Sequence, residues 1–278
     1  MAGPAPDSIS ACLVAYREEA VIERCLRSLA GVVDEIIVIH DGPCEDRTLE
    51  IARSFGARTA ELPRVGHAER HTVTAYEWAT SEWILSIDAD EFLSDELRGR
   101  LRELVRRSDV NGYEFLWRMW DGERYFTENG PHKRSLFRKR AVHLVGHIHG
   151  IEEVDPPVER TSLHLEHRPL YNNFTLKVMM RKWRRWARIH AEESLTPLEQ
   201  FPQFNIDPPR RWTARRHVLN RLSPLLALPY VVASFVLNVW STRDVYAPRE
   251  GVKMAAYSAF YGGMVQLYIA KLLYLGRR

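Results

Sequence analysis

Five carboxylates lie at residues 88–96, directly after an apolar segment, in the sequence WILSIDADEFLSDE of residues 83–96. Like charges this close repel each other, so a cation or water must offset them. Asp88 and Asp90 stand at i and i+2, and two such side chains on an extended segment point to the same side. They could therefore share Mg²⁺ or Mn²⁺, which prefer oxygen ligands and complete their shell with substrate phosphates and water.

A second interpretation of this segment needs no metal. Asp and Glu are favoured in the first turn of a helix, where the helix dipole stabilises negative charge. This explanation suits Asp95 and Glu96, which precede a helical pattern. It leaves Asp88, Asp90 and Glu91 as the candidates for chemistry.

The elements that position these carboxylates follow from periodicity in the first hundred residues. Apolar runs and helical spacing alternate there, which predicts an α/β domain with a mostly parallel sheet. Strands are predicted at 8–16, 34–41, 58–63 and 83–88, and helices at 18–31, 44–56 and 68–80.

Ligands of open α/β sheets bind outside the carboxyl ends of the strands. The residues that follow the predicted strands are Tyr16, Glu18, His40 and Asp41, besides the acidic segment at 88–91. We therefore expect polar groups from three strands at one edge of the sheet.

Composition and missing motifs exclude several classes of protein. A hydrophobic content of 45% supports a folded core in a chain of 278 residues. There is no G-x-G-x-x-G after the first strand and no P-loop, which argues against a dinucleotide-binding enzyme and a P-loop NTPase. The three cysteines, Cys12, Cys25 and Cys44, have no C-x-x-C spacing, so neither a disulfide framework nor a zinc site is indicated, and a reducing compartment is expected.

Three segments together resemble glycosyltransferase family 2, the nucleotide-sugar transferases of the GT-A fold. They are AYREE after the first strand, HDGPCEDRT after the second, and WILSIDADEF. The resemblance covers residues 8–105 and continues weakly to about residue 195. The D-A-D-E form and KRSLFRK are most similar to the branch of lipopolysaccharide inner-core glucosyltransferases. The resemblance implies a Rossmann-like sheet flanked by helices and transfer from a UDP- or GDP-sugar, with inversion.

The resemblance also implies roles for residues around the donor. The segment from Tyr16 to Glu18 flanks the nucleoside, Asp41 lies against the base, and Arg70 is the candidate near the diphosphate. His40 stands where the family often has an acidic residue, which puts the base preference in question.

The same resemblance implies a metal site. Asp90 is the principal ligand of Mg²⁺ or Mn²⁺, and Asp88 contacts ribose or metal. Some GT-A enzymes add a histidine, for which His164 is the candidate. A dedicated zinc site of the other histidines is disfavoured, since no third ligand has a recognisable spacing.

Residues 106–170 are expected to form the acceptor half, with short strands that extend the sheet. Inverting displacement needs a general base near the acceptor hydroxyl, usually a carboxylate or histidine. The candidates are Glu91, His149, Glu152 and Glu153. Four cations of this region could contact a diphosphate or an anionic acceptor, or form a solvated edge: Lys133, Arg134, Arg138 and Lys139.

The C-terminal part differs in charge from the rest. Residues 1–175 carry 22 Lys and Arg against 30 Asp and Glu, whereas residues 176–278 carry 17 against 6. Helical spacing at 177–190 combines arginines with tryptophans, which suits a membrane interface better than nucleic acid beside an acidic catalytic half. Uncharged runs follow at 222–242 and 254–270.

These runs allow a helical hairpin in the bilayer, amphipathic helices on its surface, or ordinary core packing. Arginines at 210–221 precede the first run, which favours the cytoplasmic face of the cell membrane. We therefore predict a catalytic domain at 8–170, whose donor half is 8–105, and a membrane-associated helical region at 171–278.

The predicted function is metal-dependent transfer of a sugar from a nucleotide-sugar donor to a cell-envelope or lipid-linked glycan acceptor. One alternative is a nucleotidyltransferase with a paired-Asp Mg²⁺ site, although no glycine-rich basic loop follows the first strand. The other is a scaffold that keeps the fold without turnover. No nucleic-acid partner is expected.

Overall fold

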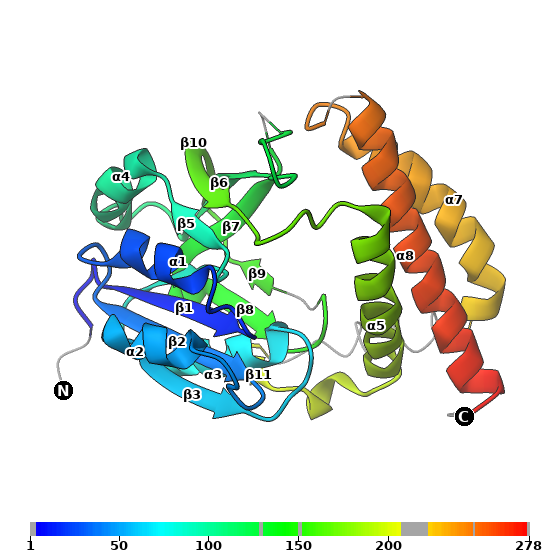
Figure 1. The fold of residues 1–278 in the computed structure, drawn as a ribbon, viewed down its shortest axis with the longest axis horizontal. Helices are drawn as coiled ribbons and strands as arrows, with labels where there is room; N and C mark the ends of the chain where they lie inside the picture. The colour runs from blue at the N-terminus through cyan, green and yellow to red at the C-terminus, as the bar shows by residue number, and fades with distance from the viewer. Residues whose placement is uncertain (1–3, 128–129, 150–151, 207–221, 247, 277–278) are drawn as a thin grey trace.

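The chain forms an α/β part built on a large sheet and a helical part that packs beside it (Figure 1). A computed structural model describes residues 4–127, 130–149, 152–206, 222–246 and 248–276. The arginine-rich stretch at 210–221 lies outside the described residues.

The large sheet has eight strands in the order β3-β2-β1-β4-β7-β6-β10-β5. Its strands are β1 (Ile9–Ala15), β2 (Glu35–Asp41), β3 (Arg58–Leu62), β4 (Trp83–Ser86), β5 (Glu91–Leu93), β6 (Gly112–Arg118), β7 (His132–Arg138) and β10 (Val158–His167). Strands β3, β2, β1 and β4 run parallel, so their carboxyl ends lie at one edge, as predicted. Beyond β4 the pairs β4/β7, β7/β6 and β10/β5 are antiparallel. The sheet is therefore mixed: the predicted parallel arrangement holds for its first four strands and for the pair β6/β10.

Residues 106–170 extend the sheet as predicted, because β7, β6 and β10 continue it beyond β4. A second sheet has three short strands in the order β11-β8-β9. These are β8 (Val142–Val145), β9 (Glu152–Val154) and β11 (Gln203–Phe204).

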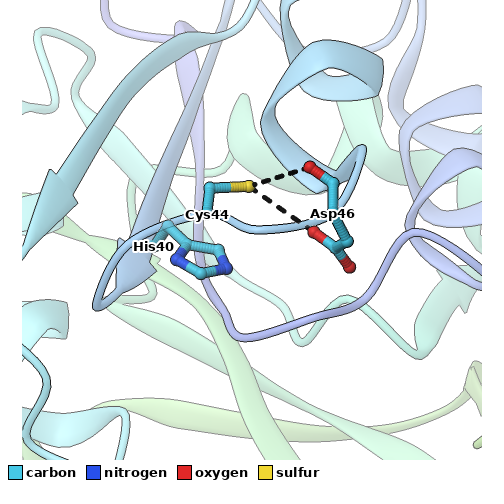
Figure 2. Close-up of side chains that lie close together, drawn as sticks. All are labelled: His40, Cys44 and Asp46. Carbon is cyan, nitrogen blue, oxygen red and sulfur yellow. Dashed lines mark hydrogen bonds between the residues drawn. The ribbon is translucent and has the colours of Figure 1, made fainter.

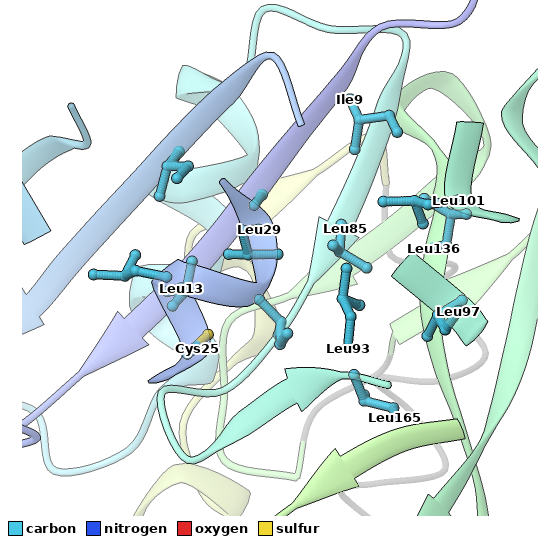
Figure 3. Close-up of a cluster of buried hydrophobic side chains, with 14 of the residues drawn as sticks. Ile9, Leu13, Cys25, Leu29, Leu85, Leu93, Leu97, Leu101, Leu136 and Leu165 are labelled. Atoms are coloured by element: carbon cyan, nitrogen blue, oxygen red, sulfur yellow. The ribbon is translucent and has the colours of Figure 1, made fainter. Parts of the chain in front are cut away.

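Alternate residues of the parallel strands enter two different cores, because successive side chains of a strand point to opposite faces. Ile9 and Leu13 join one core together with residues of α1 (Ile22–Leu29), α2 (Thr48–Ser54) and α4 (Asp95–Val105). Figure 3 shows part of this core, where side chains from the sheet meet those of α1 and α4. Cys12 and Ile37 join the other core together with α3 (Glu69–Trp78). Burial on both faces explains why these strands are continuously apolar.

The acidic segment divides as predicted at the start of α4. Ser94 caps this helix, since its Oγ accepts a hydrogen bond from the Leu97 N–H at 3.2 Å. Asp95 and Glu96 occupy the first turn, where they stabilise the helix dipole.

The helical part contains α5 (Leu176–Ser194), α7 (Ser223–Ser241) and α8 (Pro248–Tyr274), which lie side by side in Figure 1. The predicted domain boundary at 170/171 lies between the end of β10 at His167 and the start of α5 at Leu176. α5 packs on α8 through Ala187, Ala191, Val265 and Ile269. Among the described residues, no helix combines the length and apolar character needed to cross a membrane.

The Gly-Gly pair of α8 lets α7 approach closely. A Cβ at Gly262 would stand 2.2 Å from Tyr230, and a Cβ at Gly263 would stand 2.5 Å from Val231. Any side chain at these two positions would therefore push the helices apart. Among the side chains of α7 that the structure describes, none is fully buried, and many large apolar ones are exposed.

Candidate active site

Lys133 of β7 joins two of the five carboxylates in an ion-paired cluster. Its Nζ lies 2.8 Å from Asp88 Oδ2 and 2.7 Å from Glu91 Oε2. Glu91 is fully buried, and its carboxylate also accepts the Asp88 N–H at 2.8 Å. Burial lowers the pKa of Lys133, but the charges of Asp88 and Glu91 outweigh burial and raise it. Part of the repulsion in this segment is therefore offset by a lysine of the chain itself.

Asp90 is held by a histidine at the end of β10. His167 Nε2 lies 3.4 Å from Asp90 Oδ2, and the Asp90 carbonyl accepts the Arg168 N–H at 2.9 Å. Burial opposes ionisation of Asp90, but the hydrogen bond from His167 and its charge, with that of Lys133, lower the pKa below its ordinary value. The carboxylate is therefore ionised at neutral pH.

The histidine near Asp90 is thus His167 and not the predicted His164. Side chains alternate along β10, so His164 and His167 lie on opposite faces of the strand. The burial pattern follows this alternation, with residues 163, 165 and 167 buried and residues 164 and 166 half-buried. The antiparallel pairing of β10 with β5 sets His167 opposite Glu91 and next to Asp90.

Glu18 extends this acidic site from the loop after β1. Burial, followed by the charges of Asp90 and Asp88, raises the pKa of Glu18 to about 7, and Lys182 of α5 opposes the shift. The Lys182 ammonium is itself held by Asn173 Oδ1 at 2.6 Å. The helical part therefore contributes a cation to a site built mainly by the sheet.

The donor set fits a divalent cation. Burial is the main cause of the raised pKa of Glu18, and the charges of Asp90 and Asp88 add to it, so these three carboxylates interact. Among the described residues, Asp88 and Asp90 do not form a compact set of three metal ligands: no third His, Cys, Asp or Glu brings a ligand atom within 4.8 Å of both of theirs while these two are also that close. The protein thus offers few ligands, which suits Mg²⁺ or Mn²⁺ completed by substrate phosphates.

Asp41 of β2 is buried and fully engaged by protein donors. Its carboxylate accepts the N–H groups of Val65 and Gly66 at 2.6 and 2.9 Å, and His71 Nε2 lies 3.0 Å away. Burial alone would raise the pKa of Asp41, but these hydrogen bonds and the Arg64 charge lower it to about 2. Asp41 therefore fixes the loop at 63–66. The contact of Asp41 with a base stays a prediction.

Arg64 is a site residue that the sequence did not indicate. Its guanidinium lies 3.1 Å from the centroid of the Tyr16 ring and donates to the Asp41 carbonyl at 3.0 Å. Tyr16 and Asp41 were both predicted to contact the donor nucleoside. Arg64 joins them into one surface at the ends of β1 and β2.

Arg70, predicted near the diphosphate, ties α3 to α5. Its guanidinium lies 2.9 Å from Glu193 Oε1, and Glu193 also lies 3.0 Å from His67 Nε2. Burial opposes protonation of His67, but Glu193 and Glu69 raise its pKa to about 9. Arg70 is therefore held in an ion pair with Glu193. Lys182, whose charge interacts with Asp90 and Glu18, is the cation that acts on the acidic site.

The four predicted general bases occupy different surroundings, and Glu153 of β9 is simply exposed. Glu91 is buried against Lys133, so its oxygens are committed and the structure argues against this role. Glu152 of β9 is half-buried and accepts a hydrogen bond from the Tyr76 hydroxyl at 3.1 Å, while burial raises its pKa. His149 lines a pocket of about 350 Å³ between α5 and α8, and burial lowers its pKa.

Comparison with curated proteins identifies glycosyltransferases as relatives. An uncharacterized glycosyltransferase of Rickettsia bellii is 35% identical over 105 residues, which cover 38% of this chain and 35% of that protein. The lipopolysaccharide core biosynthesis glycosyltransferase LpsC of Rhizobium meliloti is 32% identical over 135 residues, covering 46% and 49%. The chain therefore spans less than half of the length of these curated relatives.

Two solved structures and a family model complete the comparison. S. aureus TarS 1–349 aligns over 91% of this chain and 90% of its own, with a TM-score of 0.44 and 12% identity. Glucosyl-3-phosphoglycerate synthase of Mycobacterium tuberculosis, in complex with Mn²⁺, UDP and phosphoglyceric acid, covers 75% and 95% with a TM-score of 0.44 and 15% identity. The model of glycosyl transferase family 2 matches residues 10–152, just over half of the chain. On this match, the chain belongs to glycosyl transferase family 2.

Proposed function

We propose that this chain is a metal-dependent glycosyltransferase that moves a sugar from a nucleotide-sugar donor to a cell-envelope or lipid-linked glycan acceptor, with inversion. The observation that carries the proposal is the convergence of Glu18, Asp88 and Asp90 where β1 and β4 end. The site lies on a GT-A-like α/β fold in a chain of family 2. A UDP- or GDP-sugar is the proposed donor.

Each charged residue of the site has a defined part in this proposal. Asp90 and Asp88 hold Mg²⁺ or Mn²⁺, and His167 orients Asp90 by its contact with Oδ2. The bound metal stabilises the negative charge of the departing diphosphate as a Lewis acid. Lys182 reaches the same site from α5 and contacts phosphate. Lys133 keeps Asp88 in place through its pairing with the buried Glu91.

The acceptor fits the aromatic pocket between α5 and α8. Trp183, Trp186 and Tyr261 line it together with His149. Lys182 Nζ lies 5.8 Å from the Trp186 ring centroid, which connects the pocket to the acidic site. Aromatic rings pack on the apolar faces of sugars and on lipid chains, and a few polar groups then set orientation. His149 is the general-base candidate that this placement favours.

A donor screen tests the proposal. UDP-, GDP- and dTDP-sugars, and separately UTP, GTP and dTTP, are added to the purified protein in detergent with Mn²⁺, and thermal unfolding is measured. One nucleotide class should raise the melting temperature, since a ligand at a hundred times its Kd stabilises by about 2.7 kcal/mol. EDTA should abolish the shift. If no nucleotide sugar stabilises the protein, the donor-site assignment fails; if only nucleoside triphosphates do, the nucleotidyltransferase alternative replaces it.

We also infer that α7 binds the cytoplasmic face of an anionic membrane. Large apolar side chains of α7 are exposed although the helix already packs on α8. Arginines of α5 lie in the same helical part and would meet lipid phosphate. The exposed apolar residues of α7 are Leu225, Leu228, Tyr230, Val232, Val236, Leu237 and Trp240.

Co-sedimentation with phosphatidylglycerol vesicles tests this inference. Replacing both Leu225 and Leu237 by Asp should weaken vesicle binding at least about tenfold, because burying each leucine in lipid contributes about 1.5–3 kcal/mol. Leu170→Asp is the matched control, since Leu170 is 69% exposed and Leu237 is 66% exposed, but Leu170 lies outside the helical part. Equal loss in both variants, or no binding by the unmodified protein, would contradict membrane association.

A further inference from the structure

A second cluster of metal-ligating side chains lies at the end of β2 and in the loop after it, at His40, Cys44 and Asp46 (Figure 2). One ligand atom from each residue lies within 4.8 Å of the others. Cys44 Sγ is 3.5 Å from Asp46 Oδ1 and donates to it. The cysteine spacing gave no sign of a metal site, because the partners of Cys44 are a histidine and an aspartate.

The imidazole of His40 is oriented as a ligand. Its Nδ1 lies 2.7 Å from the Gly42 carbonyl oxygen, so Nδ1 carries the proton and Nε2 keeps its lone pair. A histidine that ligates a metal usually donates its other N–H to a backbone carbonyl in this way. The Arg17 N–H approaches Nε2 at 3.3 Å, a long hydrogen bond that a cation could replace.

The carboxylate of Asp46 is fixed by the backbone and still has a free lone pair. Oδ1 accepts the Thr48 N–H at 3.0 Å, and Oδ2 accepts the Glu19 N–H at 3.4 Å. Each carboxylate oxygen has two lone-pair sites, so one on Oδ2 remains available. Oδ1 also accepts the Cys44 thiol at 3.5 Å, and its second lone pair becomes available to a metal when that thiol loses its proton. Hydrogen bonds of this kind orient a ligating carboxylate.

We propose that His40, Cys44 and Asp46 bind a borderline-soft divalent cation such as Zn²⁺. On binding, the Cys44 thiol releases its proton to solvent, and the metal takes the position of that proton between Sγ and Asp46 Oδ1. Three protein ligands leave a fourth position for water. A thiolate and an imidazole favour a metal such as Zn²⁺, whereas the carboxylates at 88–90 suit the harder Mg²⁺ or Mn²⁺. The two sites should therefore prefer different metals.

The location gives this cluster a role in the donor site. Asp46 binds the Glu19 N–H, and its charge acts on Glu18, which also faces Asp88 and Asp90. Metal binding would thus join the loop after β1 to the loop after β2, on either side of the proposed nucleoside. The proposal concerns binding at the cluster and does not depend on transfer activity.

Cobalt titration of the reduced, metal-free protein tests the site. Co²⁺ should produce a near-ultraviolet thiolate-to-cobalt charge-transfer band that saturates at one equivalent and is displaced by Zn²⁺. Cys12 and Cys25 are buried, and burial raises the pKa of both thiols, so the band would belong to Cys44. Cys44→Ser should remove the band, and Asp46→Asn should weaken cobalt affinity at least about tenfold.

Two variants serve as controls for the titration. Glu45→Gln removes an exposed carboxylate next to Cys44 that pairs with Arg17 and lies outside the cluster, so the band and affinity should persist. Asp90→Asn should also leave the band unchanged, because it affects only the other site. The proposal is overturned if no band forms, if the band survives Cys44→Ser, or if Asp46→Asn and Glu45→Gln weaken binding equally.

Discussion

Asp90→Asn is expected to lower sugar transfer by at least about a hundredfold, the usual order for losing a preorganised charge that acts on the transition state. Asp90 lies after β4 with 25% of its side chain exposed, and its carboxylate is ionised at neutral pH. Asparagine keeps the shape of the side chain and removes the charge that is proposed to hold the metal. Donor binding in Mn²⁺ should weaken together with transfer.

The matched control is Asp95→Asn, which removes an equal charge five residues along the chain. Asp95 only opens α4, so its loss should change transfer less than about twofold. Both variants are assayed for transfer and for donor hydrolysis, with the nucleotide sugar that stabilises the protein. Survival of both activities in Asp90→Asn would refute the metal site. Donor binding without any turnover in the unmodified protein would favour the scaffold alternative.

Local sequence patterns predicted the part of the site that lies on the parallel strands. Apolar runs ended at Tyr16, Asp41 and Asp88, and parallel strands bring their carboxyl ends to one edge wherever they pair. Helix-start chemistry likewise separated Asp95 and Glu96 from the other carboxylates. These features depend on neighbours in sequence, which a single chain displays directly.

The remaining site residues depend on pairings between distant segments. His167 reaches Asp90 only because β10 pairs antiparallel with β5 in one register, and periodicity could not choose it over His164. Lys182 enters from α5, more than eighty residues away from Asp90. The sequence does not distinguish Arg70 from Arg64. In the structure, Arg70 pairs with Glu193, whereas Arg64 lies over the Tyr16 ring. Contacts between such distant segments cannot be predicted from the spacing of residues along one sequence.

Lys133→Met is expected to lower the free energy of unfolding by about 3–5 kcal/mol, because it leaves the buried charge of Glu91 without its cation. Lys133 Nζ lies within 2.8 Å of both oxygens of Glu91, and the glutamate side chain is 0% exposed. Methionine has a similar length, so packing of the side chain is largely kept. Urea unfolding followed by circular dichroism measures the loss.

A double-mutant cycle separates the stranded charge from lost packing. Glu91→Gln removes the charge and keeps an oxygen for the Asp88 N–H, so the combined variant should be more stable than Lys133→Met alone by at least about 1 kcal/mol. An exposed pair provides the comparison: Arg160→Gln breaks a 3.1 Å contact with Glu114 at a site where the arginine is 67% exposed, and should cost less than about 1 kcal/mol.

The effect of Lys133→Met should also depend on pH. Burial raises the pKa of Glu91, and Lys133 opposes that shift. In Lys133→Met the carboxyl therefore takes up a proton more readily as the pH falls, and the destabilisation should shrink toward acidic pH and grow toward alkaline pH. An additive cycle, or a loss independent of pH, would mean that Lys133 contributes through its aliphatic chain and not by compensating the charge of Glu91.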